Sequence, residues 1–221
     1  MKTSPIDYVL STLMLSVMLA MSIAITRLST PWIQKVFGDY YVLINLALVL
    51  LYFGVLAAVA IRIILFLRPI PPGTYDMDSN EFVLWKLITV IYHFGRAALK
   101  PLTPIFLMPL VATLYGAKIG KDVALGGIVD APFMVEIDSR AVIGAFSLVS
   151  GNFTFGDKLI FGRVRIGAGA TIGVNAVVYP NTEIGDNAML LGGSYLMPGS
   201  RIPAGETWRG NPARKWTGGA L

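Results

Sequence analysis

The sequence contains no cysteine and only one histidine, His93. Without cysteine, the chain has no disulfide, no cysteine nucleophile and no zinc–thiolate cluster. A single histidine also excludes sites built from several imidazoles of one chain, and we predict no bound metal. Charged side chains make up only 14% of the 221 residues, against about 25% in soluble domains. These shortages exclude an ordinary soluble globule.

Apolar residues are correspondingly abundant. They make up 55% of the chain and the mean hydropathy is +0.66, which indicates membrane-embedded sequence and excludes disorder. Lysine and arginine number 18 against 13 aspartates and glutamates, so the net charge is +5. This mild excess suits a cytoplasmic membrane surface or a phosphorylated ligand as well as nucleic acid. No nucleic-acid-binding motif accompanies it, and we predict no nucleic-acid partner.

Two uncharged segments, Tyr8–Thr26 and Tyr40–Ile61, are long enough to cross a bilayer as helices. The first is long for a cleaved signal peptide, and the second follows it closely. We therefore predict a two-helix transmembrane hairpin within residues 1–67.

The positive charges predict how this hairpin is oriented. Arg27 and Lys35 are the only basic residues between the two apolar segments. Because basic residues favour the cytoplasmic side, we expect residues 27–39 outside and both termini inside, in a bacterial inner (cytoplasmic) membrane. The basic residues that follow the second segment are Arg62, Arg68, Lys86, Arg96 and Lys100.

A connector follows the hairpin. The run Arg68-Pro-Ile-Pro-Pro-Gly73 interrupts any helix, and Asp78 with Glu81 is typical of a new helix start. The stretch 105–115 contains Pro109 and is too short to span, so we expect it to pack on the membrane or to cover the end of the next domain. From Glu81 to Lys100 we predict an interfacial amphipathic helix. Its narrow polar stripe is made of Lys86, Thr89, His93, Arg96 and Lys100.

From residue 118 the chain repeats every six residues, which excludes a long amphipathic helix. Glycine follows the repeating apolar residue at 120, 126, 144, 156, 167, 173 and 185. The first apolar series is Ile119, Leu125, Ala131, Ile137, Ile143, Val149 and Phe155. The second series is Ile166, Ile172, Val178, Ile184, Leu190, Leu196 and Ile202.

This period predicts an all-β, triangular solenoid of parallel strands. Each unit supplies a short strand with one inward apolar residue and a corner, where glycine is expected to permit unusual backbone angles. Three units make one coil, so residues 119–207 predict about five stacked coils. The longer step from Phe155 to Ile166 predicts an irregular projecting loop at 156–165, with Phe161 as a partial inward position.

The repeats resemble the hexapeptide-repeat acyltransferases, which fold as left-handed parallel β-helices. The runs Ile166-Gly-Ala-Gly-Ala-Thr171 and Ile172-Gly-Val-Asn-Ala-Val177 carry the resemblance, which covers residues 118–216. The start Leu114-Tyr-Gly-Ala-Lys-Ile-Gly120 and the ending Ile202-Pro-Ala-Gly-Glu-Thr-Trp-Arg-Gly-Asn-Pro-Ala213 are more narrowly similar to the C-terminal repeat domain of some peptide synthetases, which also joins membrane segments.

The resemblance implies a homotrimer with active sites between subunits, and acetyl-CoA or another acyl-CoA as the donor. Together with the apolar segments and the connector, it divides the chain into four parts: the transmembrane hairpin (1–67), the interfacial helix and connector (68–117), the β-helix (118–207), and a cap with a basic tail (208–221). The residues it assigns to the coenzyme A site are Ser194, Arg209, Gly210, Asn211, Pro212, Arg214 and Lys215.

The sequence departs from the family at the catalytic base. Acyl transfer needs a base that takes the acceptor's proton, and the family uses a histidine on a coil. At the matching position stands Asn152, which cannot be a base but can orient a substrate or stabilise an oxyanion. Either His93 reaches the site, or a carboxylate replaces the histidine, or the domain does not catalyse acyl transfer. The carboxylate candidates are Asp130, Asp157, Glu136 and Asp138.

Two functions remain open at this point. The leading hypothesis is a membrane-anchored acyltransferase that moves an acyl group to a hydroxyl or amine of a membrane-associated acceptor, such as a lipid-linked glycan, a surface polysaccharide or a peptide. The alternative is a non-catalytic trimeric scaffold or ligand-binding protein, which the missing repeat histidine favours. A γ-class carbonic anhydrase shares the fold but needs several histidine ligands, so we set it aside.

Overall fold

The computed structural model describes residues 5–218 and divides them into two compact units. The helical unit contains residues 5–70 and 77–104, and the β-helix unit contains residues 71–76 and 105–218. The chain therefore enters the β-helix unit briefly between two helices and returns to it for good after residue 104. The two chain ends that we expect in the cytoplasm, 1–4 and 219–221, lie outside the described residues.

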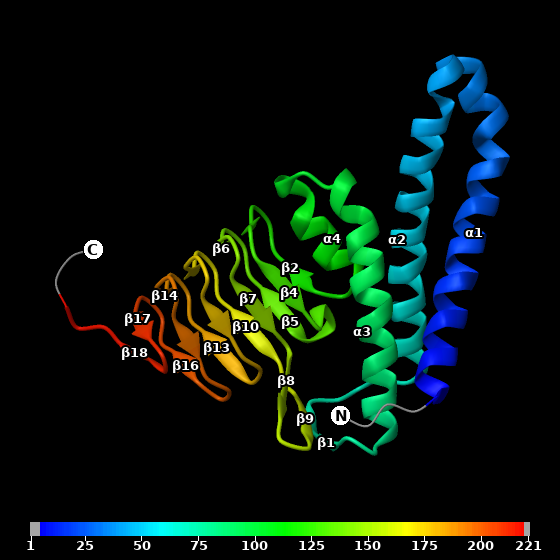
Figure 1. Ribbon diagram of the computed structural model, residues 1–221. Coiled ribbons are helices and arrows are strands. Elements are labelled where there is room, and N and C mark those ends of the chain that lie inside the picture. Colours follow the sequence, from blue (N-terminus) through cyan, green and yellow to red (C-terminus); the bar gives the residue numbers. More distant parts are fainter. Residues whose placement is uncertain (1–4, 219–221) are drawn as a thin grey trace. The chain divides into compact units, whose positions relative to one another are not determined.

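The helical unit consists of three long helices that lie side by side (Figure 1). They are α1 (Pro5–Phe37), α2 (Tyr41–Leu67) and α3 (Asn80–Leu99), with the short 3-10 helices η1 (Gly38–Tyr40) and η2 (Lys100–Leu102). By length and composition alone, two helical stretches are apolar enough to cross a bilayer. These are Pro5–Leu67, which contains α1 and α2, and Asn80–Leu102, which contains α3.

Two features of α3 differ from the expected helix. Its N-cap is Ser79, whose Oγ accepts a hydrogen bond of 3.2 Å from the backbone N–H of Phe82, one residue later than the expected start at Asp78. Both residue types cap helices well, so local sequence does not decide between them. Lys86, expected on an exposed stripe, instead forms an ion pair with Asp7 of α1, and each side chain is only 10% exposed.

The β-helix unit is built from three sheets of parallel strands that stack over about five turns (Figure 1). The first two sheets have five parallel strands each, and the third has four. The first sheet contains β2 (Lys118–Ile119), β5 (Val135–Ile137), β10 (Val164–Ile166), β13 (Thr182–Ile184) and β16 (Arg201–Ile202). The second contains β3 (Ala124–Leu125), β6 (Val142–Ile143), β11 (Thr171–Ile172), β14 (Met189–Leu190) and β17 (Thr207–Gly210), with β18 (Ala213–Lys215) antiparallel at its edge. The third contains β4 (Ile128–Asp130), β7 (Leu148–Ser150), β12 (Val177–Val178) and β15 (Tyr195–Leu196).

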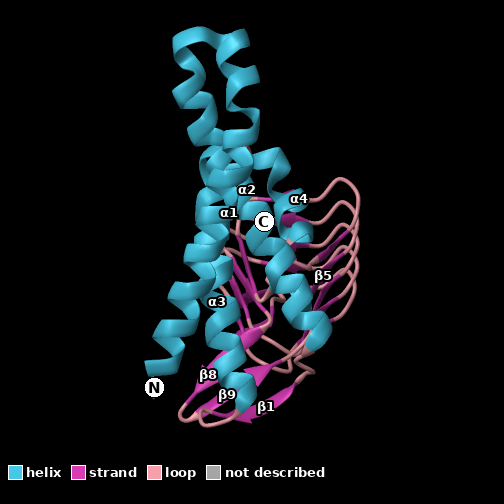
Figure 2. Ribbon diagram, turned by 90° about the vertical axis from the view of Figure 1, so that its right-hand side faces the viewer, coloured by secondary structure: helices cyan, strands magenta, loops and turns pink. Residues whose placement is uncertain are grey.

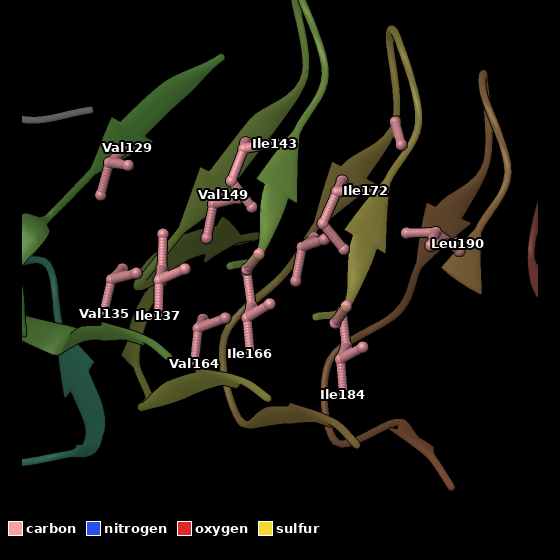
Figure 3. Packing of buried hydrophobic residues seen from close by; sticks show 14 of the residues in the cluster. Val129, Val135, Ile137, Ile143, Val149, Val164, Ile166, Ile172, Ile184 and Leu190 are labelled. Atoms are coloured by element: carbon pink, nitrogen blue, oxygen red, sulfur yellow. The ribbon is translucent and has the colours of Figure 1, made fainter. Parts of the chain in front are cut away.

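The repeating apolar residues fill the interior of the coils, as the sequence predicts. Ile137, Ile166 and Ile184 are register partners in neighbouring strands, so they stack in one column (Figure 3). Each such side chain contributes about 1.5–3 kcal/mol when it is fully buried. The fully buried members of the two series are Ile137, Ile143, Val149, Ile166, Ile172, Val178, Ile184, Leu190, Leu196 and Ile202, each at most 2% exposed.

Six of the seven repeat glycines have a different role from the expected one, and only Gly156 has the expected positive φ, 60°. A Cβ on Gly173 would lie 2.3 Å from the backbone nitrogen of Gly192 in the next coil, and one on Gly144 would lie 2.7 Å from that of Val174. Neither glycine has a positive φ, so backbone freedom is not the reason for them. The left-handed corner comes two residues later and accepts Asn175 at φ 57°. Glycine is therefore needed because adjacent coils approach too closely for a side chain.

A three-stranded antiparallel sheet replaces the irregular loop expected at 156–165. Its order is β1 (Gly73–Asp76), β9 (Lys158–Phe161), β8 (Asn152–Phe155), and Figure 2 shows the three strands together. The prediction that Phe155 points inward is wrong, because this side chain is 70% exposed, whereas Phe161 is fully buried. The sequence pattern could not predict this sheet, because its edge strand β1 comes from the distant connector.

The first coil is covered by a short helix. After the 3-10 helix η3 (Ile105–Leu107), α4 (Met108–Leu114) packs against β2 and β3. Ala112 is part of the buried core of the coils, and Met108 packs against it. The expectation that this stretch covers the end of the solenoid is confirmed. The 3-10 turn η4 (Pro132–Met134) lies between β4 and β5.

Candidate functional site

Asp130, Ser150 and Asn152 form a polar cluster where the hairpin β8–β9 leaves the coils. Asn152 Nδ2 donates a hydrogen bond of 3.0 Å to Asp130 Oδ2. Ser150 Oγ lies 3.2 Å from the same carboxylate oxygen and 2.8 Å from the backbone carbonyl of Asn152. One hydroxyl has one proton, so Ser150 donates to one of these acceptors at a time. The structure thus brings together two residues that the sequence singles out separately.

The parallel register places this cluster. Asp130 ends β4 and Ser150 ends β7, and the two residues are register partners in the third sheet. Gly151 follows and leaves no room for a side chain, because a Cβ there would lie 2.4 Å from Met134 Cβ. Gly162 N–H donates to the carbonyl of Gly151 at 3.0 Å, which closes the base of the hairpin. Asn152 is therefore held against Asp130 by backbone pairing on both sides.

The cluster presents acceptor oxygens to its surroundings. Asp130 is half-buried, and among the described residues its second oxygen, Oδ1, accepts no hydrogen bond. The amide NH2 of Asn152 must face the carboxylate, because a donor is needed there, so the Asn152 carbonyl oxygen points elsewhere. Two such oxygens suit a ligand that carries an O–H or N–H group. A carboxylate in this position can also take the proton of that group.

Asp157 is not part of the cluster. It lies in the turn of the hairpin, between β8 and β9, while Asn152 is at the opposite end of β8. Three residues of strand separate Asn152 from Phe155, which is about 10 Å at the rise of an extended chain. Asp157 instead contributes to the field at Lys158, whose pKa is raised mainly by its hydrogen bond to Asp76.

His93 belongs to the helical unit. It is exposed on α3, and its Nδ1 lies 2.9 Å from the carbonyl oxygen of Thr89, one helical turn earlier. A carbonyl accepts only from a protonated nitrogen, so in the neutral ring the free lone pair is on Nε2. The ring contacts Tyr92 edge-on. A catalytic role for His93 stays a prediction.

The residues assigned to the donor site gather at the C-terminal hairpin of β17 and β18. The buried Ser194 accepts a hydrogen bond of 3.1 Å at its Oγ from the backbone N–H of Gly210. Asn211 and Pro212 form the turn, through a cis peptide bond. Ser194 therefore anchors the hairpin to the last coils.

The basic residues of this hairpin are divided between its two faces. Arg209 and Arg214 are cross-strand partners and both are exposed, so their guanidinium groups share one face. The guanidinium of Arg209 lies 5.7 Å from the ring of Trp216. Lys215 is on the other face, where its ammonium is 2.6 Å from Glu206 Oε1.

Lys215 is therefore held in a small network of its own. Glu206 accepts from Lys215 and, at 2.9 Å, from Trp208 Nε1, and these bonds lower the pKa of Glu206. Trp208 packs against the apolar core. The hairpin thus has two exposed arginines on one face, while its lysine is paired with a carboxylate on the other.

Another carboxylate candidate, Glu136, is committed to a charge ladder on the first sheet. It accepts from Lys118 Nζ at 2.5 Å and from Arg165 Nε at 3.2 Å. The hydrogen bond from Lys118 is the main cause that lowers the pKa of Glu136. The full ladder alternates in sign along the register: Lys118, Glu136, Arg165, Glu183 and Arg201.

Sequence reasoning missed the role of Ser150 in this cluster. The only available signal was the Ser-Gly-Asn break in the repeat at 150–152, which marks where the chain leaves the coil. Within residues 5–218, no three histidine, aspartate or glutamate side chains are grouped so as to hold a metal ion.

The comparisons confirm the hexapeptide repeat. The family model described as bacterial transferase hexapeptide (six repeats) matches residues 163–198. No curated protein matches the sequence.

Solved structures of hexapeptide-repeat acetyltransferases are similar to this chain at low identity. A hexapeptide-repeat-containing acetyltransferase from Vibrio cholerae is 18% identical with a TM-score of 0.43, and the match covers 46% of this chain and 62% of that one. Galactoside acetyltransferase in complex with coenzyme A is 21% identical with a TM-score of 0.41, over 44% of this chain and 52% of that one. Serine acetyltransferase from Neisseria gonorrhoeae is 16% identical with a TM-score of 0.42, over 97% of this chain and 80% of that one.

The chain thus spans 62% and 52% of the length of the first two structures. Similarity this low carries no information on activity or substrate.

Proposed function

We propose that the chain is a membrane-anchored acyltransferase that moves an acetyl or other acyl group from acyl-CoA to a hydroxyl or amine of a membrane-associated acceptor. The observation that carries the proposal is the hydrogen bond between Asn152 and Asp130. It puts a carboxylate beside the position where the family resemblance implies a histidine base. The matched family model, which describes bacterial transferases, supports the same reading.

In this proposal Asp130 is the base. Its Oδ1 takes the proton of the acceptor as the acceptor's oxygen or nitrogen attacks the thioester carbon. The new C–O or C–N bond forms, the C–S bond breaks, and the proton leaves on the sulfur of coenzyme A. Asn152 and Ser150 hold Oδ2 of the carboxylate, so Oδ1 is aimed at the acceptor.

The donor is proposed to bind at the C-terminal hairpin. Arg209 and Arg214 share an exposed face and can form charge-assisted hydrogen bonds to the phosphates of coenzyme A. Ser194 and Gly210 fix the hairpin on which these arginines stand. No metal is needed for this chemistry.

We further infer left-handed coils and a homotrimer, as the family resemblance implies. The outer surface of the β-helix supports self-association, because its charged ladder is confined to the first sheet. Apolar side chains are exposed elsewhere: Ile128 and Met197 on or beside the third sheet, Val142 on the second, and Phe146 and Val174 at corners between the two. Such patches favour contact with another protein surface.

The proposed anchor is the hairpin of α1 and α2, in a bacterial inner membrane. Large apolar side chains point outward from it, among them Val9, Leu13 and Leu46, which are 68%, 57% and 59% exposed. Exposed apolar residues over the length of a bilayer suit a lipid environment. With both termini and the β-helix on the cytoplasmic side, the acceptor would be presented by the membrane itself.

Calorimetry with acetyl-CoA tests the proposal on the detergent-purified full chain. We expect saturable binding that is about ten- to a hundredfold weaker when Arg209 and Arg214 are both replaced by Gln, because two charge-assisted contacts are lost. The matched control is Lys215→Gln, since Lys215 is already paired with Glu206. No binding to a folded sample would contradict the proposal and favour the non-catalytic scaffold.

A further inference from the structure

A cavity of about 400 Å³ lies at one end of the helical unit. The beginnings of α1 and α3 and the end of α2 lie together there (Figure 1). All three helices contribute apolar side chains to its walls: Leu10, Leu67, Val83, Leu84 and Leu87. Cavities of about 300–1,000 Å³ with apolar walls and a few polar groups are typical of binding sites for small molecules. This cavity has the size and the walls of such a site.

Two charged side chains line the same cavity. Arg68 is the first residue after α2 and is exposed, and Glu81 lies in the first turn of α3 and is half-buried. Within residues 5–218, neither side chain forms an ion pair or a hydrogen bond, with the other or with any other residue. The amide of Asn80, which can donate and accept, is also part of the lining. The cavity therefore offers a ligand one positive and one negative group.

A second cavity of the same unit lacks this property. It has a volume of about 380 Å³ and lies between α1 and α3. Its charged residues, Asp7 and Lys86, form an ion pair in which each side chain is 10% exposed. A charged ligand would have to separate this pair, and breaking a buried pair is costly. The first cavity is therefore the better site for a charged ligand.

The position of Arg68 points to the membrane interface. The helix before it, α2, is apolar over most of its length, and its last residue, Leu67, is 70% exposed. An arginine directly after such a helix places its guanidinium at the level of the lipid headgroups. Guanidinium groups bind phosphates through charge-assisted hydrogen bonds. Because Glu81 in the same cavity needs a positive partner, a headgroup with both charges fits better than a purely anionic one.

We infer that this cavity binds a bilayer phospholipid with a phosphoethanolamine headgroup. The phosphate pairs with Arg68, the ammonium donates hydrogen bonds to Glu81, and the first carbons of an acyl chain lie against the leucines of the walls. The inference rests on the membrane anchor of the proposed function, to which it adds a specific lipid. A choline headgroup carries the same charges but has no N–H, and a glycerol headgroup has no cation, so both should bind more weakly.

Native mass spectrometry of the detergent-purified full chain tests this with three phospholipids of equal chain length. These are phosphatidylethanolamine, phosphatidylcholine and phosphatidylglycerol. We expect phosphatidylethanolamine to bind about fivefold more tightly than the other two, because one partly exposed charged contact is gained. Arg68→Gln should weaken the binding of all three about fivefold, and Glu81→Gln should remove the preference among them. Lys35→Gln is the matched control, since this basic residue lies at the other end of the hairpin.

Three results would overturn the inference: equal binding of the three lipids, a preference that persists in Glu81→Gln, or unchanged affinity in Arg68→Gln. Full competition by soluble phosphoethanolamine would also overturn it, because the occupant would then be a free phosphate ester rather than a bilayer lipid.

Two further measurements separate this failure from failure of the proposed function. Alkaline carbonate extraction of membranes tests the anchor, and calorimetry with acetyl-CoA tests donor binding. A chain that stays in the membrane and binds acetyl-CoA, but shows no lipid preference, contradicts only the lipid site. A chain that carbonate extracts contradicts the anchor, and the lipid site with it.

Discussion

Asn152 donates a 3.0 Å hydrogen bond to Asp130, although 22 residues separate the two in the chain. One coil of the solenoid lies between them, so the parallel register of β4 and β7 makes them neighbours. An asparagine at the position of an expected histidine base is thus accompanied by a carboxylate from the preceding coil. The pair gives the proposed site its chemistry and leads to the first prediction.

Replacing Asp130 by Asn should lower the rate of acyl transfer by about 10²–10⁴-fold, because the proton acceptor is lost while the shape is kept. The measurement is thiol release from acetyl-CoA in the presence of acceptors that carry a hydroxyl or amine group. Asp157→Asn and His93→Ala serve as comparisons, since each removes an alternative base. A full rate in Asp130→Asn, with a strong loss in either comparison, would move the role of base to that residue.

Gly173→Ala should destabilise the β-helix more than Gly193→Ala does. A Cβ at Gly173 would lie 2.3 Å from backbone of the next coil, whereas a Cβ at Gly193 would contact nothing within 4 Å. We expect a loss of about 3 kcal/mol in the free energy of unfolding for the first, because backbone must move. Gly193→Ala should lower the free energy of unfolding by about 1 kcal/mol, because alanine is strained at the positive φ of this position.

Thermal or denaturant unfolding of the two variants measures this difference. Equal losses would mean that backbone angle, rather than the approach of the coils, explains the repeat glycines.

Stability should depend on pH through Glu136. Hydrogen bonds from Lys118 and then Arg165 lower its pKa in the folded state below the ordinary value of 4.5. A carboxylate with a lowered folded pKa stabilises the fold above its unfolded pKa, and this contribution disappears as pH falls through the folded pKa. Glu136→Gln should therefore lower Tm at pH 7, and its Tm should approach that of the wild type well below pH 4.5.

Melting curves of both proteins across this pH range provide the measurement. Lys118→Met is the informative partner, because Lys118 is the largest cause of the shift. In that background the effect of Glu136→Gln should shrink. A Tm difference that stays constant down to the acid end would contradict the assignment.

The pairing of β1 with β9 can be tested by a disulfide. The chain has no cysteine, so an introduced pair has no native competitor. Thr74 and Ile160 are register partners, and cross-strand Cβ atoms lie about 5 Å apart. Thr74→Cys with Ile160→Cys should form a disulfide on mild oxidation, seen as a shift in non-reducing gel mobility.

In the matched control, the second cysteine is introduced one strand farther from Thr74. Phe153 is the partner of Ile160 on the other side, about 10 Å from Thr74 across two strand spacings. Thr74→Cys with Phe153→Cys should therefore stay reduced under the same conditions. Equal cross-linking of both pairs would mean that the connector does not pair with β9 as a strand.

The helices and the solenoid could be predicted from the sequence, because each follows from a local pattern: a long apolar run for the helices and a six-residue repeat for the solenoid. Apolar runs as long as Tyr8–Thr26 leave little alternative to a long helix. A six-residue step from Ile166 to Ile202 puts every inward side chain on the same relative position of successive strands, and all of those residues are buried. Such patterns need no knowledge of distant contacts.

The tertiary structure decided what the period does not encode. The role of Gly173 depends on the neighbouring coil, and the exposure of Phe155 depends on a hairpin completed by β1, about eighty residues away in the chain. The meeting of Asp130 with Asn152, and the separation of Lys215 from Arg209 and Arg214, follow from strand register. Register is set by packing between coils and strands, and therefore the chemistry of the site appears only once the chain is folded.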